Sequence, residues 1–242
     1  VPLATTVFDI MLSSEPGRLE RTAALDLLDE ILLTGCSSEE YSELVAAVQS
    51  QFSQIGPRDA PWLSSVLDLL LLSSSPDPSE RLAVVSEAFG LVQSWTDRIE
   101  DTDIVLLSRV FNDAGLELPV RTGPPTDDPD SRQPIRTFRK VGIYSLLEPA
   151  ARTAQRWIKE MWPGTDVPLA HDHVNRRPLE ALVRSADVML VQTSRATHAA
   201  TNAIRDAAPD SSRIVLVHGR GATALLRGLI QWSEGGDQEP LS

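Results

Sequence analysis

Cysteines, a secretory leader and long apolar runs are scarce or missing in this chain of 242 residues. Because Cys36 is the only cysteine, an internal disulfide and a cysteine metal cluster are excluded, and a cytoplasmic location is expected. No apolar stretch approaches the roughly 20 residues of a membrane helix, so no membrane partner is expected. The chain starts at Val1 without a basic, apolar leader, which fits an excised fragment.

A basic surface is also missing from the first half of the chain. Residues 1–120 hold 20 acidic and 6 basic side chains, a net charge of −14, whereas residues 141–242 hold 11 of each. The first half should therefore repel nucleic acid and anionic membranes. The second half, which holds all four histidines, is the expected location of an anionic ligand.

Periodic apolar patterns predict that residues 1–118 form an all-helical domain. Ser37 and Glu40 make a capping-box pattern at the start of a helix over residues 37–55. Asp77 and Pro78 mark the start of another, whose apolar stripe runs to Trp95. Further patterns predict helices over residues 18–33, 60–72 and 102–114.

A weak repeat of roughly 40 residues accompanies these helices. The sequence Leu-Asp-Leu-Leu at residues 25–28 returns at residues 67–70. Two helices per period are typical of HEAT and armadillo units, although a non-repetitive helical bundle would give the same pattern. The acidic side chains are scattered rather than grouped for chemistry, so this domain is expected to bind a protein partner.

The rest of the chain divides into a linker, a second domain and a tail. Residues 119–138 are rich in proline and are expected to be an extended linker. In residues 139–234 apolar runs of strand length alternate with helical patterns, and residues 235–242 are expected to be a flexible tail. The predicted strands cover residues 141–144, 167–170, 188–191 and 214–217, and the predicted helices residues 149–161, 178–184, 198–207 and 222–232.

This alternation predicts a small parallel sheet of the Rossmann-like or flavodoxin-like kind, with strand order 2-1-3-4. Polar side chains follow each strand, and ligands of such sheets bind outside the carboxyl ends of the strands. A small anionic ligand, such as a nucleotide or a phosphate-like group, is expected there. The predicted ligand-binding residues are Ser145, His171, His173, Thr193, Ser194, Arg195, His198, His218, Gly219, Arg220, Gly221 and Thr223.

The loop after the last strand carries a glycine motif. Gly219, Gly221 and Ala224 satisfy the pattern G-x-G-x-x-A between a strand and a helix. A dinucleotide fingerprint is disfavoured, because that motif belongs to the first strand–helix unit and no strand follows here. Either an anion is held by the backbone N–H groups and Arg220, or the glycines only give the backbone freedom for a tight turn.

The last hundred residues resemble an uncharacterised bacterial family of small Rossmann-like α/β domains. The similarity rests on ADVMLVQTSRATHAA and the later HGRGATALLRGL, with matching positions Asp187, Thr193, Thr197, His198 and Arg220. The stretch YSLLEPAA lacks the glycine-rich turn that often follows the first strand in such domains. The resemblance leaves the N-terminal half unassigned and implies no known reaction.

The same strand ends also carry residue types that occur in catalytic and metal sites. His171 and His173 could join His198 and His218 around a zinc ion, but no helical motif fixes such a ligand set. Ser194 lies near His198 in sequence, yet the nucleophile-elbow motif is absent. No catalytic residue, metal or cofactor is therefore predicted.

These observations favour a non-catalytic binding or scaffold protein, with a helical module for a protein partner and a Rossmann-like module that senses an anion. One alternative is a nucleotide hydrolase or a metal-dependent phosphodiesterase that uses the strand-end histidines. Another is a scaffold subunit of a bacterial DNA-processing or defence complex.

Overall fold

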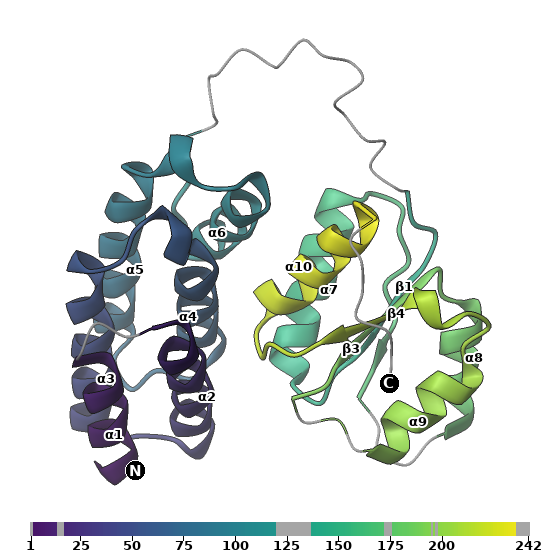
Figure 1. Ribbon diagram of the computed structural model, residues 1–242, viewed down its shortest axis with the longest axis horizontal. Coiled ribbons are helices and arrows are strands. Elements are labelled where there is room, and N and C mark those ends of the chain that lie inside the picture. The colour runs from purple at the N-terminus through teal and green to yellow at the C-terminus, as the bar shows by residue number, and fades with distance from the viewer. Residues whose placement is uncertain are drawn as a thin grey trace. The chain divides into compact units, whose positions relative to one another are not determined.

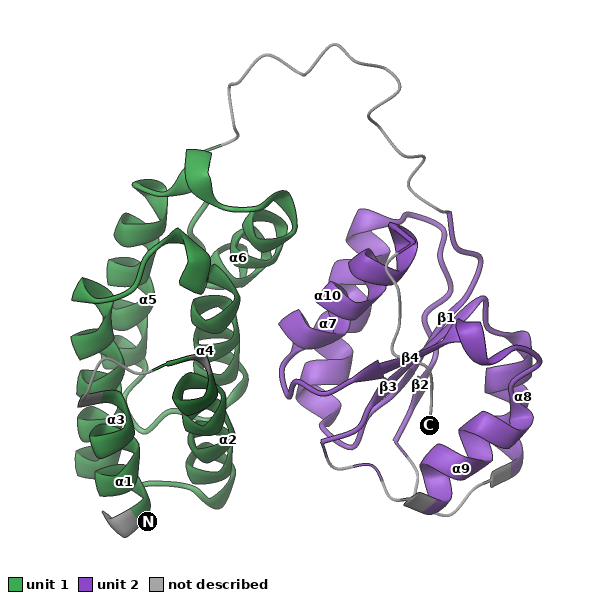
Figure 2. Ribbon diagram, viewed as in Figure 1, with its two compact units in different colours: residues 1–122 green, residues 123–242 purple. Residues whose placement is uncertain are grey.

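A computed structural model describes residues 2–13, 17–119, 137–171, 176–194, 196 and 198–235. The chain forms two compact units, residues 1–122 (unit 1) and residues 123–242 (unit 2) (Figure 2). Most of the expected linker, residues 120–136, and most of the expected tail, residues 236–242, lie outside the described residues. Within the described part, no helix combines the length and the apolar character needed to cross a membrane.

Unit 1 is entirely helical, as predicted. Its helices are α1 Pro2–Ser13, α2 Arg18–Thr34, α3 Ser38–Ser50, α4 Ala60–Leu72, α5 Pro78–Gln93 and α6 Asp101–Asp113, with short 3₁₀ turns η1 Gln51–Ser53, η2 Pro57–Asp59 and η3 Thr96–Arg98. The predicted capping box is present: Ser37 N donates to Glu40 Oε2 at 2.8 Å, and Glu40 N donates to Ser37 Oγ at 3.2 Å. The Asp77 carboxylate likewise accepts the N–H groups of Ser79 and Glu80 at the start of α5.

Three boundaries differ from the sequence-based prediction. Helix α1 was not predicted, because its apolar and β-branched run has no start signal that sets it apart. The helix predicted over residues 37–55 ends at Ser50 and tightens into η1. Trp95 lies beyond the end of α5 and is buried at the turn before η3, rather than on the helix.

The six helices stack in two layers (Figure 1). One layer holds α1, α3 and α5, the other holds α2, α4 and α6, and each helix contacts its neighbour in the layer. Between α3 and α5, Ser42 Oγ donates to Glu80 Oε2 at 2.9 Å and Gln49 Nε2 donates to Glu87 Oε2 at 2.7 Å. Both bonds join residues 38 positions apart, so the stacking follows the helix-pair period seen in the sequence.

Unit 2 contains a four-stranded parallel sheet. Its strands are β1 Val141–Tyr144, β2 Leu169–Ala170, β3 Val188–Gln192 and β4 Ile214–Val217. They lie in the order β2-β1-β3-β4, which confirms the predicted order. The helices are α7 Glu148–Met161, α8 Arg176–Ser185, α9 His198–Ala207 and α10 Ala222–Ser233, and a 3₁₀ turn η4 Ser211–Arg213 precedes β4.

The helices cover both faces of this sheet (Figure 1). Helices α7 and α10 pack together on one face, and α8 and α9 pack together on the other. The second strand is shorter than predicted and covers Leu169 and Ala170, although β1 also donates from Val141 N to Asp166 O and from Ile143 N to Pro168 O. Pro168, which has no N–H group to donate, directly precedes them on this edge strand.

Candidate anion site at the strand ends

The described site residues gather at the carboxyl edge of the sheet, because all four strands are parallel. Ser145 follows β1, His171 follows β2, Thr193 and Ser194 follow β3, and the loop from His218 to Gly221 joins β4 to α10. Three predicted residues are not placed: His173 and Arg195 lie outside the described residues, and His198 opens α9 but its side chain is not described.

A buried glutamine links three of these strand ends. Ser145 Oγ donates to Gln192 Oε1 at 2.5 Å, and Gln192 Nε2 donates to the carbonyl of Gly219 at 2.8 Å. Gln192 is the last residue of β3, so its amide joins the loops that follow β1 and β4. Sequence reasoning missed Gln192, although a single polar residue at the end of an apolar strand was the available signal.

Ser145 takes part in the buried hydrogen bonds at this edge of the sheet. Its side chain is fully buried, and its hydroxyl accepts the N–H of Leu147 at 3.0 Å while it donates to Gln192. A hydroxyl that already serves as donor and acceptor has little left to offer a ligand. The geometry therefore supports a bracing role for Ser145, and its predicted ligand contact stays a prediction.

Thr193 and His218 form the second link between β3 and β4. Thr193 Oγ1 lies 3.2 Å from the carbonyl oxygen of Val217 and 3.0 Å from Nδ1 of His218. When the hydroxyl donates to the carbonyl, it can accept a hydrogen bond from an Nδ1–H group of the exposed imidazole. The pair thus joins the end of β3 to the loop that follows β4.

The glycine loop is held by close packing rather than by unusual backbone angles. Neither Gly219 nor Gly221 has a positive φ, so the expectation that both supply turn freedom is wrong. Gly221 is extended, with φ −93° and ψ −179°. A Cβ atom at Gly219, however, would lie 2.4 Å from the Cβ of Ala224. Glycine is required at 219 because the loop folds directly onto the first turn of α10.

The start of α10 is buried and has no side-chain cap. Gly221 is its N-cap residue and makes no capping hydrogen bond, while Ala222 and Thr223 are 0% and 1% exposed. The N–H groups of a first helical turn have no partner within the helix and carry the positive end of its dipole. Beside this turn, Arg220 is partly buried.

Ser194 adds a polar group in the loop after β3. Its Oγ is buried and has no hydrogen-bond partner among the residues that the structure describes. A buried hydroxyl without a partner is unfavourable unless a ligand or water satisfies it. Ser194 is thus suited to contact a ligand held between the β3 and β4 loops.

His171 lies apart from this group. Its charge contributes to lowering the pKa of the Glu148 carboxyl, after the larger effects of the hydrogen bond and charge of Arg152. His171 is therefore near the start of α7, and in the described chain no hydrogen bond joins it to the β3 or β4 loops. No group of three or more His, Cys, Asp or Glu side chains able to hold a metal ion occurs among the described residues.

Asp187 acts at the opposite end of the sheet. Its Oδ2 accepts the N–H groups of Arg139 and Lys140 at 2.7 and 2.9 Å. These bonds tie the segment entering β1 to the residue before β3. The aspartate of the family pattern thus has a structural explanation in this chain.

Comparison with known proteins gives one result. No curated protein and no solved structure matches the chain significantly. A family model described as DpdD-like matches residues 1–228 and so includes both units. The resemblance confined to the last hundred residues is therefore too narrow in extent. The chain belongs to the DpdD-like family.

Proposed function

We propose that this protein is a non-catalytic binding and scaffold subunit. Unit 2 holds a small anionic group at the carboxyl edge of its sheet, and unit 1 binds a protein partner. Membership of the DpdD-like family hints at a DNA-modification or defence-associated protein. The scaffold role is accordingly proposed within such an assembly.

The buried, uncapped start of α10 carries the anion-binding part of the proposal. Since Gly221 offers no side chain and Ala222 is fully buried, solvent is a poor partner for the first-turn N–H groups. An anion is the partner that these groups and the helix dipole favour. Arg220 directly precedes the N-cap residue Gly221. Its guanidinium suits bidentate hydrogen bonds to a phosphate or carboxylate bound at this position.

The two hydrogen bonds of Gln192, to Ser145 and to Gly219, support the same interpretation, and we call them the brace. Gln192 fixes the carbonyl of Gly219, and the contact between Gly219 and Ala224 fixes the loop against the helix. A loop held from both sides presents its N–H groups in one geometry, which reduces the ordering free energy that binding must offset. The proposal assigns the histidines no catalytic role, because His171 and His218 lie in separate contacts.

Binding of inorganic phosphate, sulfate and ATP to the full chain tests this part, measured by calorimetry at fixed ionic strength. Arg220→Ala should weaken binding by roughly 1.5–3 kcal/mol, the contribution of a charge-assisted hydrogen bond. Arg213→Ala is the matched control, since Arg213 is exposed and precedes the amino end of β4. No binding of any of the three anions, or equal affinity of both variants, contradicts the proposal.

A further inference from the structure

Ligands of open parallel sheets usually bind where two neighbouring strands send their loops to opposite faces of the sheet. In unit 2 this occurs between β1 and β3, because β1 leads to α7 on one face and β3 leads to α9 on the other (Figure 1). A nucleotide bound in the usual way would lie in the crevice between these two loops. The residues that occupy this crevice therefore decide which class of ligand the sheet can accept.

The side chains of Ser145 and Gln192 close the crevice on the side of α7. They follow and end β1 and β3, are 0% and 2% exposed, and form a hydrogen bond of 2.5 Å. Tyr144 and Val191, which precede them, belong to the core under α8 and α9. Because successive side chains of a strand point to opposite faces, Ser145 and Gln192 point to the face that α7 and α10 cover. Their hydrogen bond joins the two strand ends at the position where a nucleoside would enter.

Apolar side chains cover the other side of the same crevice. Leu146, in the loop after β1, packs against the core under α8 and α9, and Ala196, in the loop after β3, packs against the same core. The first loop is short, since α7 begins at Glu148. The second loop turns back at once, with Ala196 N donating to the carbonyl of Thr193 at 3.2 Å. Each described residue of these two loops is buried or half-buried, so the crevice is filled by the chain itself.

The exposed part of this edge lies beside β4. The loops after β3 and β4 also lead to opposite faces, since α9 packs with α8 and α10 packs with α7. In the loop after β4, His218 and Gly219 are exposed, and Nδ1 of His218 lies 3.0 Å from Thr193 Oγ1. The uncapped start of α10 follows this loop. An anion bound there would have the exposed loop on one side and the filled crevice on the other.

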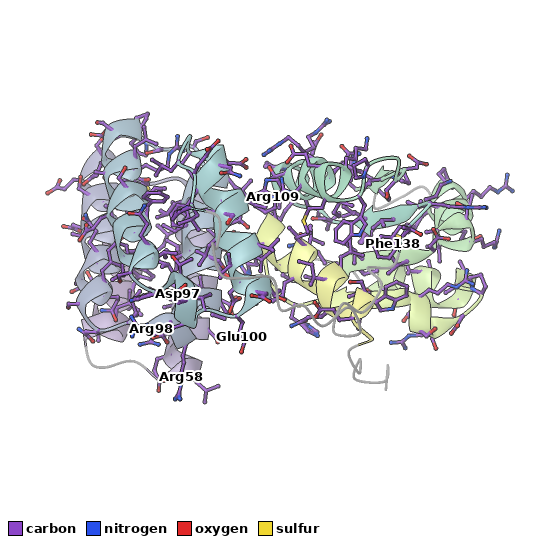
Figure 3. The ribbon with its side chains drawn as sticks, turned by 90° about the horizontal axis from the view of Figure 1, so that it is seen from above. Arg58, Asp97, Arg98, Glu100, Arg109 and Phe138 are labelled. Atoms are coloured by element: carbon purple, nitrogen blue, oxygen red, sulfur yellow. The ribbon has the colours of Figure 1, made fainter. Side chains whose placement is uncertain are left out.

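The aromatic side chains of unit 2 that could stack on a base are already packed. At the amino edge of the sheet Phe138, which precedes β1, lies against Trp162 and Trp232, with ring centroids 5.4 and 6.0 Å apart (Figure 3). Phe138 and Trp162 are 7% and 8% exposed. Tyr144 and Trp157 are buried in the core. Base recognition normally uses an accessible ring face, and the carboxyl edge of the sheet receives none of these rings.

We infer that unit 2 recognises its ligand by a single phosphate group and makes no specific contact with a base or a ribose. The ligand class is inorganic phosphate or a phosphate monoester, whose remaining part would extend past the exposed His218 and Gly219 into solvent. A nucleotide would bind only as well as any other monoester. This inference rests on the anion site proposed for unit 2 and specifies the part of the ligand that the site contacts.

Calorimetry on the full chain at fixed ionic strength tests the inference with inorganic phosphate, methyl phosphate, AMP and adenosine. Methyl phosphate and AMP should bind with dissociation constants within about threefold of each other, because the phosphate group is what they share. Adenosine should not bind. Inorganic phosphate identifies the source of the ligand: equal affinity for phosphate and the monoesters fits a phosphate carried on a larger molecule, and binding of inorganic phosphate alone fits a free oxyanion.

A pair of serine variants connects the measurement to the site. Ser194→Ala should weaken the binding of methyl phosphate and of AMP by the same factor, about fivefold, which is the contribution of one hydrogen bond to the shared group. Ser185→Ala is the matched control, since Ser185 is exposed and ends α8, at the amino edge of the sheet. It should leave both affinities unchanged. Both variants should keep the wild-type melting temperature.

Three results would overturn the inference: binding of AMP that is more than about threefold tighter than that of methyl phosphate, measurable binding of adenosine, or a loss in Ser194→Ala that affects AMP but not methyl phosphate. Each would reveal a nucleoside contact while the anion site itself remained. If neither inorganic phosphate nor a monoester binds, the anion proposal fails, and the inference fails with it.

Discussion

The side-chain amide of Gln192 lies 2.8 Å from the carbonyl oxygen of Gly219, 27 positions along the chain. The carbonyl oxygen of the same side-chain amide accepts a hydrogen bond from the hydroxyl of Ser145. One buried residue therefore sets the spacing of the loops after β1 and β4. The candidate anion site is bordered by that second loop, so its geometry depends on a residue that need not touch the ligand.

Replacing Gln192 should damage stability and binding together. Gln192→Leu removes both hydrogen bonds, including the one from the buried hydroxyl of Ser145, which costs about 1–3 kcal/mol. Hydrogen exchange of the β3 and β4 amides should report the loss, and phosphate affinity should fall because the glycine loop is released. Gln231→Leu, at an exposed position of α10, is the control and should change neither quantity. Wild-type exchange rates in Gln192→Leu would refute the bracing role.

The contact between Gly219 and Ala224 can be tested by a double-mutant cycle. Gly219→Ala places a methyl group against the Ala224 methyl group and should destabilise unit 2 by about 1–3 kcal/mol. Adding Ala224→Gly should recover part of this loss, because it removes the clashing atom. Gly90→Ala, on α5 with no atom near the new Cβ, should be neutral or stabilising. Simple additivity of the two changes in unfolding free energy would rule out the contact.

Acid should weaken the helix caps of unit 1. The pKa of Asp77 is lowered by the hydroxyl of Ser79 and by the N–H groups of Glu80 and Ser79, and the pKa of Glu40 is lowered chiefly by the N–H of Ser37. A carboxylate whose folded pKa is depressed stabilises the fold above its unfolded pKa, and this stabilisation is lost as pH falls through the folded pKa. Melting temperature should therefore decline below about pH 4.

The variant Asp77→Asn separates this effect from general acid unfolding. Asparagine can still cap α5 but does not titrate, so the variant should lose less stability than the wild type between neutral pH and pH 3. Asp113→Asn, at the C-terminal end of α6, is the matched control and should follow the wild type. Parallel acid curves for Asp77→Asn and the wild type would exclude a titrating cap.

The two units are expected to fold independently. Each has its own buried core, and the proline-rich segment between them separates two different architectures. Residues 1–118 and 138–235, expressed separately, should each unfold cooperatively on heating. If neither fragment shows a cooperative transition, the two-domain organisation predicted from the sequence is wrong.

Much of the fold is local enough to be read from the sequence. The caps at Ser37 and Asp77 join residues within one helical turn, and strand–helix alternation under right-handed connection rules leads to the order β2-β1-β3-β4. The placement of polar residues at one edge of the sheet follows from the same parallel topology. Local spacing was less informative for α1, which has no start signal, and for β2, where Pro168 interrupts an edge strand.

Only the tertiary structure decided which polar groups face one another. Gln192 meets Ser145 and Gly219 across 47 and 27 positions, distances at which sequence spacing carries no geometric information. Glycine is needed at 219 because Ala224 packs against it, and not because of a backbone angle that a turn pattern could indicate. Periodicity and capping act over a single turn of chain, whereas the hydrogen bonds of Gln192 depend on which strand ends the packing of the sheet brings together.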